Sequence, residues 1–209
     1  MTRTPDRPIV LVVHGLLMGR PLMWPLAARL RQRGFATANF GYGTWLGTPA
    51  RAMERLAMVL YGLAPGPVHV VAHSLGALVA LEAMNQYQRL PPGRVVCLGA
   101  PIAGSSAARA LAQRGIGPLS GRGGPLMRGG LQQLPPREVA MIAGAKSMGM
   151  GRVVSRFDGL NDGTVAVWET RLPGLREHAV LPVSHTGLIF DPKVASMAAD
   201  FIETGYFRL

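Results

Sequence analysis

The chain has 209 residues, of which 48% are hydrophobic and 16% are charged. This length and composition indicate a single globular domain over residues 1–209 with a sizeable core, and they exclude a disordered chain. No apolar run reaches the roughly 18 residues that a membrane-spanning helix needs. The one cysteine, Cys97, cannot form an internal disulfide and lies in the apolar run RVVCLG, so we expect a buried, inert thiol and a soluble cytoplasmic protein.

The charge is strongly unbalanced. Lysine and arginine number 22 against 11 acids, a net charge of +11, and no acid occurs between Ala83 and Arg137. Such a field could draw the protein into weak contact with an anionic membrane surface. The stronger interpretation is that an arginine-rich, lysine-poor composition reflects the base composition of the genome. No basic helix carries interleaved aromatic residues, so we expect no nucleic-acid partner.

The first residues, MTRTPDRPIVLVVHGLL, contain an apolar run. Asp6 precedes this run, His14 interrupts it, and no small-residue cleavage site follows. We therefore predict a strand here and no signal peptide.

Short β-branched runs alternate with helical patterns along most of the chain, which is typical of a parallel sheet covered by helices. Several runs lack polar alternation, as strands buried on both faces do. Strands are predicted at residues 8–13, 35–40, 68–72, 94–99, 138–144 and 178–183. Helices are predicted at 21–33, before Gly34, at 49–61, before Gly62, and from the N-cap Asp191 with Pro192 to Gly205.

The stretch from Pro101 to Pro136 breaks this rhythm. It is rich in glycine, with seven glycines among the sixteen residues from Gly115 to Gly130. Because glycine removes steric limits on the backbone, we expect a mobile segment there. It is either a lid over a pocket or a disordered surface insertion.

The run VVAHSLGALVALEAM places Ser74 between a predicted strand and a predicted helix. Ala72 and Gly76 flank it, and a sharp strand-to-helix turn requires small residues at both positions. Such a turn strains the serine backbone and lifts the hydroxyl clear of the sheet. The alternative is that Ser74 is an ordinary N-cap.

A serine hydroxyl needs a base, and the base needs an orienting group. His185 lies in PVSHTGLIF, just after a predicted strand, where sites of such sheets gather. Asp158 and Asp162 in FDGLNDGTVAV are candidates for the acid, and Asp162 is preferred because the extended TVAV follows it. The chain order Ser74, Asp162, His185 is the one that accompanies a nucleophile elbow.

The oxyanion formed during acyl transfer needs fixed donors. We expect these to be the backbone amides of Leu75, after the serine, and Leu16, after the His14–Gly15 pair that ends the first strand. His14 is expected to orient this loop. A substrate pocket is expected among residues of the loops after the first two strands: Leu17, Met18, Trp24, Tyr42 and Trp45.

Together these motifs resemble the α/β-hydrolase superfamily, and specifically small bacterial triacylglycerol lipases and esterases. VLVVHGLL is similar to the strand that carries an oxyanion amide, AHSLG to the nucleophile elbow with alanine for the first glycine, NDGTVAV to the acid loop and SHTGLIF to the histidine loop. The resemblance covers about Ile9 to Ile202. It implies an α/β-hydrolase fold and a serine carboxylic-ester hydrolase without cofactor or metal, acting on a small acyl ester or a lipid.

Two alternatives remain. The same triad can serve an acyltransferase or a thioesterase, because nothing in the sequence fixes the acceptor or the leaving group. The chain could also be a non-catalytic protein whose basic, glycine-rich segment binds an acidic partner or a membrane surface.

Overall fold

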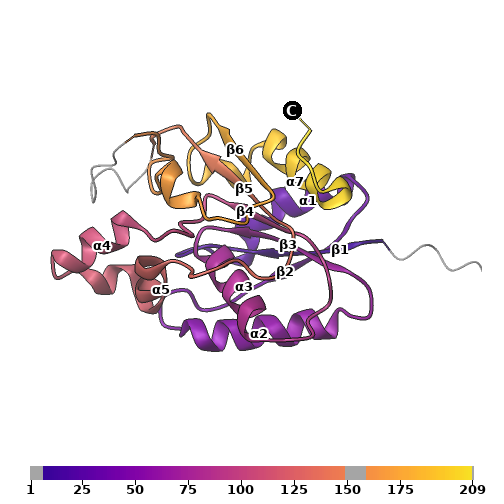
Figure 1. Ribbon diagram of the computed structural model, residues 1–209, viewed down its shortest axis with the longest axis horizontal. Helices are drawn as coiled ribbons and strands as arrows, with labels where there is room; N and C mark the ends of the chain where they lie inside the picture. The colour runs from indigo at the N-terminus through magenta and orange to yellow at the C-terminus, as the bar shows by residue number, and fades with distance from the viewer. Residues whose placement is uncertain (1–6, 149–158, 209) are drawn as a thin grey trace, which may run out of the picture.

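The computed structural model describes residues 7–148 and 159–208 of the chain. Its parallel sheet has six strands in the order β2-β1-β3-β4-β5-β6 (Figure 1). All six predicted strands are present, with small shifts at their ends. They are β1 (Ile9–Val13), β2 (Ala36–Phe40), β3 (Val68–His73), β4 (Val95–Leu98), β5 (Val139–Gly144) and β6 (Glu177–Leu181).

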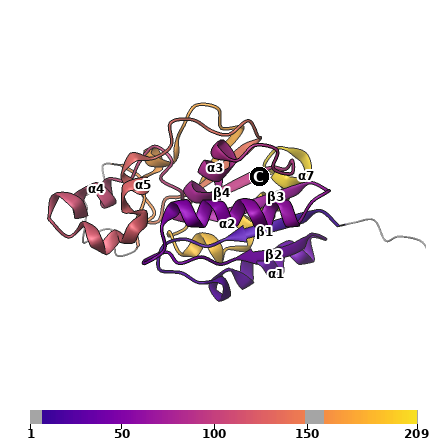
Figure 2. The same ribbon diagram turned by 90° about the horizontal axis from the view of Figure 1, so that it is seen from below.

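Helices cover both faces of the sheet. The helices α1 (Trp24–Gln32) and α7 (Pro192–Thr204) pack on one face, and α2 (Pro49–Gly62) and α3 (Leu75–Gln86) pack on the other. Figures 1 and 2 show these two layers, with α2 and α3 towards the viewer in the second. The architecture is the predicted α/β-hydrolase fold.

Burial explains the strand patterns. Every residue of β3, β4 and β5 is buried, which accounts for their uninterrupted apolar runs. The edge strands β2 and β6 are partly exposed and more polar. The strand that leads to Ser74 therefore lies inside the sheet, held by neighbours on both sides.

Three helix boundaries differ from the prediction, one of them the end of α1, which lies at Gln32 and not at Arg33. The segment Arg20–Met23 is a 3-10 helix and α1 begins at Trp24, because the ring of Pro25 cannot be accommodated inside a helix that starts at Pro21. Gly62 is the last residue of α2 and not the residue after it. The predicted caps of α7 are confirmed: Asp191 accepts hydrogen bonds from the amides of Lys193 and Val194, and Gly205 has a φ of 84°.

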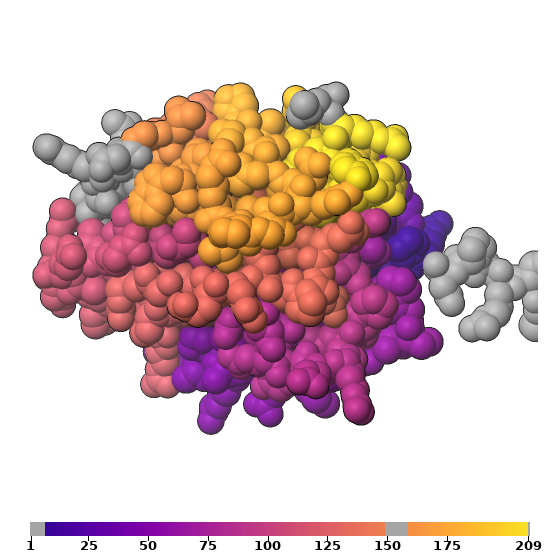
Figure 3. All heavy atoms as spheres, in the orientation of Figure 1, coloured from indigo at the N-terminus to yellow at the C-terminus, as the bar shows by residue number. Residues whose placement is uncertain are grey.

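The glycine-rich stretch forms three short helical segments, which we call the insertion: α4 (Ser106–Gln113), the 3-10 helix η2 (Gly117–Gly123) and α5 (Gly124–Gly129). It projects at the left of Figures 1 and 3. The Gly121 backbone lies against Thr44 and Trp45, and the Arg122 amide donates to the carbonyl of Trp45 at 3.2 Å. Tertiary contacts thus order a segment whose local sequence favours irregular structure.

Within residues 7–148 and 159–208, no helix is both long and apolar enough to cross a membrane.

Cys97 is fully buried in β4, and burial raises the pKa of its thiol to about 12. The predicted buried thiol is confirmed, and at neutral pH it stays protonated.

Candidate active site

Ser74 lies at the turn between β3 and α3 with φ 52° and ψ −125°. This left-handed conformation costs a non-glycine residue about 1–3 kcal/mol and persists only where the surroundings enforce it. The Ser74 side chain makes no capping hydrogen bond to α3. The N-cap interpretation therefore fails, and the sharp predicted elbow is present.

Close packing enforces the elbow. A Cβ at Gly76 would lie 2.3 Å from the His14 carbonyl oxygen, and a Cβ at Gly15 would lie 3.0 Å from the Ser74 Cβ. Only glycine fits at either position, which explains why the residue two positions after Ser74 is Gly76. The end of β1 and the start of α3 consequently meet at Ser74.

His185 and Asp162 form a hydrogen-bonded pair. The His185 Nδ1 lies 2.7 Å from the Asp162 Oδ2, and both side chains are almost fully buried. The other carboxylate oxygen, Oδ1, accepts from the amides of Thr164 at 2.9 Å and Val165 at 2.7 Å. With Nδ1 protonated and bonded to the carboxylate, the His185 Nε2 carries the free lone pair. Asp158, the other candidate acid, lies outside the described residues.

The backbone of β4 brings this pair to the elbow. The Ser74 amide donates to the Leu98 carbonyl at 2.9 Å. The next residue, Gly99, has φ 54°, and a Cβ on it would lie 3.1 Å from both the Asp162 Oδ2 and the His185 Nδ1. The end of β4 thus touches the serine on one side and the acid–base pair on the other.

His73 is a further residue of the site that the sequence did not assign. It is fully buried, its Nε2 lies 3.0 Å from the His185 carbonyl oxygen, and the two imidazole rings are 4.5 Å apart. The His73 pKa is well below its usual value of 6.5, mainly because the ring is buried and secondly because His185 is nearby. A neutral ring with its proton on Nε2 therefore joins the elbow to the histidine loop.

The two residues expected to supply oxyanion donors are Leu16, in the loop after β1, and Leu75, the first residue of α3. Leu16 follows Gly15, and Leu75 follows Ser74. Among the described residues, neither amide donates a hydrogen bond. The Leu17 amide is used differently, because it donates to the Thr44 Oγ1 at 3.1 Å.

His14 holds the loop that carries Leu16. Its Nε2 accepts from the Tyr42 amide at 3.4 Å, and its ring stacks on Tyr42 at 4.8 Å. The Tyr42 hydroxyl donates to the His14 carbonyl at 3.1 Å. Burial lowers the His14 pKa, so the ring is neutral. Its contacts with Tyr42 connect the loops after β1 and β2, as expected of a residue that orients the loop.

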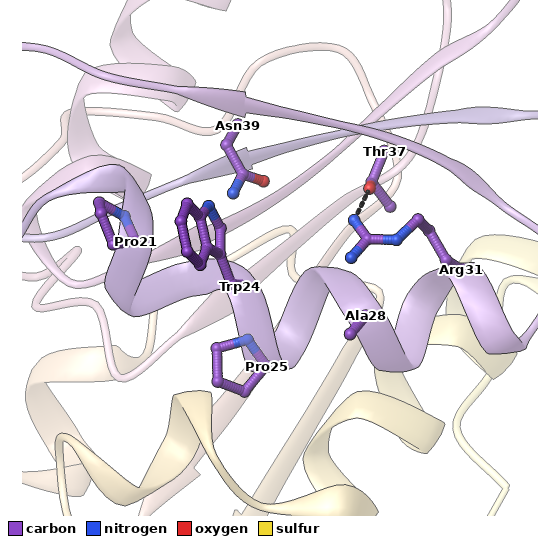
Figure 4. A pocket seen from close by; sticks show the side chains of 7 residues that line it. All are labelled: Pro21, Trp24, Pro25, Ala28, Arg31, Thr37 and Asn39. Carbon is purple, nitrogen blue, oxygen red and sulfur yellow. Dashed lines mark hydrogen bonds between the residues drawn. The ribbon is translucent and has the colours of Figure 1, made fainter.

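The five expected pocket residues separate into two groups. Leu17, Tyr42 and Trp45 lie in loops that contact one another on the α2–α3 side. Met18 packs against the α1–α7 core on the other side of the sheet. Trp24 lines a surface pocket of about 720 Å³ together with residues of α1 and β2 (Figure 4). It is the first residue of α1, and the Trp24 ring points towards Asn39 on the edge strand β2. Met18 and Trp24 therefore lie apart from Leu17, Tyr42 and Trp45, and the five residues do not form one pocket.

Glu169 is a second residue that the sequence did not indicate. It is fully buried, and its carboxylate accepts hydrogen bonds from the amide of Ala166, at 2.8 Å, and from the amide of Ser106. Its carbonyl accepts from the Ala103 amide at 2.9 Å. Glu169 thus connects the acid loop to the start of the insertion.

The comparisons with known proteins agree with the fold described above. The family model described as "Alpha/beta hydrolase family" matches residues 9–202. The chain belongs to the alpha/beta hydrolase family. No curated protein matches the sequence of this hydrolase.

Solved structures show the same fold at low sequence identity. A metagenomic carboxyl esterase has a TM-score of 0.73 at 20% identity, with 97% of this hydrolase and 77% of the esterase covered. A Bacillus licheniformis lipase in propeptide form has a TM-score of 0.69 at 21% identity, with 89% of this hydrolase and 48% of the lipase covered. A type II thioesterase from the borrelidin biosynthetic cluster has a TM-score of 0.64 at 16% identity, with 98% and 94% covered. The chain thus spans about half the length of the lipase.

Proposed function

We propose that this hydrolase cleaves carboxylic esters through a covalent acyl-enzyme on Ser74. The observation that carries the proposal is the buried Asp162–His185 pair, held by Gly99 next to a strained serine whose hydroxyl does not cap its helix. A buried carboxylate bonded to Nδ1 fixes the tautomer in which Nε2 can accept a proton. No cofactor is needed for this chemistry.

In the proposed reaction, the Ser74 oxygen attacks the ester carbonyl carbon while the His185 Nε2 takes the hydroxyl proton. The tetrahedral intermediate collapses, the carbon–oxygen bond to the alcohol breaks, and His185 gives its proton to the departing alkoxide. Water then repeats the sequence on the acyl-enzyme, releasing the acid and restoring Ser74. Asp162 stabilises the imidazolium in both halves.

The amides of Leu16 and Leu75 are the proposed donors to the negatively charged oxygen. The loss of one such donor typically raises the barrier by about 2.7–4 kcal/mol. Leu17, Tyr42 and Trp45 are the proposed contacts of the acyl group, since their loops adjoin the oxyanion loop. The substrate would be a small acyl ester or a lipid.

The insertion is the proposed cap of this site. A Cβ at Gly123 would lie 2.7 Å from the Leu75 side chain, which follows the serine directly. Only 7% of Ser74 and 8% of His185 is exposed. A cap held on Leu75 and Trp45 would exclude water from the oxyanion site, where electrostatic interactions are stronger.

A panel of acyl esters and thioesters of increasing chain length tests the proposal. We expect hydrolysis of oxygen esters, and loss of at least about a thousandfold in kcat for Ser74→Ala, consistent with the loss of a nucleophile. Ser196→Ala is the matched control, because this serine lies on α7, on the opposite face of the sheet from α3, and its hydroxyl accepts from Arg33; it should retain activity. Faster turnover of thioesters would indicate a thioesterase, and product formed only with an added alcohol would indicate an acyltransferase. Folded wild type that cleaves no acyl substrate would contradict the proposal.

A further inference from the structure

Four large apolar side chains are exposed on segments that adjoin the proposed site. Leu17 is 69% exposed, Leu46 77%, Ile116 43% and Leu119 53%. They come from the loops after β1 and β2 and from the insertion. We call these four residues the apolar rim.

Backbone contacts hold the parts of the apolar rim together. The Leu17 amide donates to Thr44, and the Gly121 backbone packs on Thr44 and Trp45, next to Leu46. Leu119 lies two positions before Gly121 in η2. Exposed leucines occur singly on most proteins, but here they are on three segments that contact one another.

The charge of the insertion has one sign. Arg114 and Arg122 are exposed on the insertion, and the chain has no acid between Ala83 and Arg137. Exposed apolar side chains beside arginines, on a segment without acids, are a combination that binds an anionic lipid surface, through burial of the apolar groups and attraction of the cations.

We propose that the apolar rim and the insertion arginines dock on an anionic lipid bilayer. This proposal rests on the proposed function and extends it, because docking there would place the entrance to Ser74 against the bilayer and favour esters dissolved in it. The insertion, which lies on Leu75 and Trp45, would then be in contact with lipid on its outer side.

The test measures sedimentation of Ser74→Ala protein with vesicles, so that no lipid is consumed. We expect co-sedimentation with phosphatidylcholine vesicles containing phosphatidylglycerol at low salt, release at high salt, and little binding to phosphatidylcholine alone. Replacing Arg114 or Arg122 by Gln should each lower the partition coefficient about fivefold, the equivalent of about 1 kcal/mol per cation near the surface. Leu46→Ser and Leu119→Ser should lower it at every salt concentration.

Two matched controls keep the test specific. Met58→Ser changes an equally exposed apolar residue on α2, and Arg7→Gln changes an exposed arginine just before β1; both should bind as the parent does. Absence of sedimentation, or equal losses in these controls, would overturn the proposal. Because the binding assay needs no catalysis, its failure would leave hydrolysis of a water-soluble ester by the wild type unaffected, and the two proposals can fail separately.

Discussion

A buried histidine connects two loops of the proposed site. The His73 Nε2 donates to the His185 carbonyl, and because its pKa is well below 6.5 the ring stays neutral at ordinary pH. The contact fixes the backbone of the residue whose side chain is the proposed base. His73 is thus a positioning residue and not a proton carrier.

Replacement of His73 by Phe should keep the ring and remove the donor. A buried carbonyl left without a partner costs about 1–3 kcal/mol, and if part of this cost displaces His185, kcat should fall about tenfold while KM changes little. Steady-state kinetics on a soluble ester would measure both constants. His73→Gln, which offers an amide donor, should recover part of kcat. Equal kcat in the wild type and the Phe variant would show that this contact has no positioning role.

At the scale of the elements, Glu169 connects the acid loop to the insertion. Its carboxylate accepts amide hydrogen bonds from Ala166 and from Ser106, the first residue of α4. The negative charge also lies at the positive end of that helix, where it is favourable. The acid loop and the insertion therefore share one buried anchor.

Replacement of Glu169 by Gln should weaken this anchor. An amide NH₂ would face one of the two backbone donors, and the loss of a hydrogen bond to a buried charged group costs about 1.5–3 kcal/mol. We expect the free energy of unfolding in urea to fall by this amount, with a lower kcat from the displaced Asp162 loop. Glu54→Gln on the exposed side of α2 should change neither. Unaltered stability in Glu169→Gln would refute the anchoring role.

The central strands could be predicted from their sequences, whereas the helices of the insertion could not. The central strands were predictable because burial on both faces requires uninterrupted apolar runs, as in β3 and β4. The insertion was not, because its helices depend on contacts with Leu75 and Trp45 that are remote in sequence. Glu169 was missed for a related reason: a carboxylate normally marks the surface, and only the fold supplies the amides that allow its burial.

At the level of the site, chain order and turn residues were sufficient for Ser74, Asp162 and His185 to be proposed. The strained elbow and the Asp162–His185 bond were then found in the structure. The contribution of Gly99 could not be predicted, because its φ of 54° and its closeness to both side chains arise from the register of β4 beside β3. The separation of Trp24 from the other pocket candidates likewise depends on where α1 begins.

At the scale of the whole molecule, buried neutral histidines should make stability depend on pH. Burial lowers the pKa of His69 and His178 to about 4, and it also lowers those of His14 and His73. The unfolded chain binds protons near pH 6.5, where these folded groups do not. Their contribution is therefore fully present above about pH 6.5 and is lost as the pH falls towards about 4.

Thermal unfolding between about pH 8 and about pH 5 measures this effect. The midpoint temperature should be nearly constant above about pH 7 and should fall below about pH 6.5. His69→Asn should reduce the slope, because the amide oxygen can still accept from Arg94 while the titrating group is gone. A midpoint that rises on acidification would refute the assignment of these histidines as buried and neutral.

Covalent labelling with a fluorophosphonate, followed by peptide mapping, tests directly whether Ser74 is a nucleophile activated by His185 and Asp162. We expect one adduct, on Ser74, with a labelling rate that falls sharply in His185→Ala and in Asp162→Asn although both variants remain folded. An adduct on a different serine, or a folded wild type that reacts no faster than His185→Ala, would contradict this expectation.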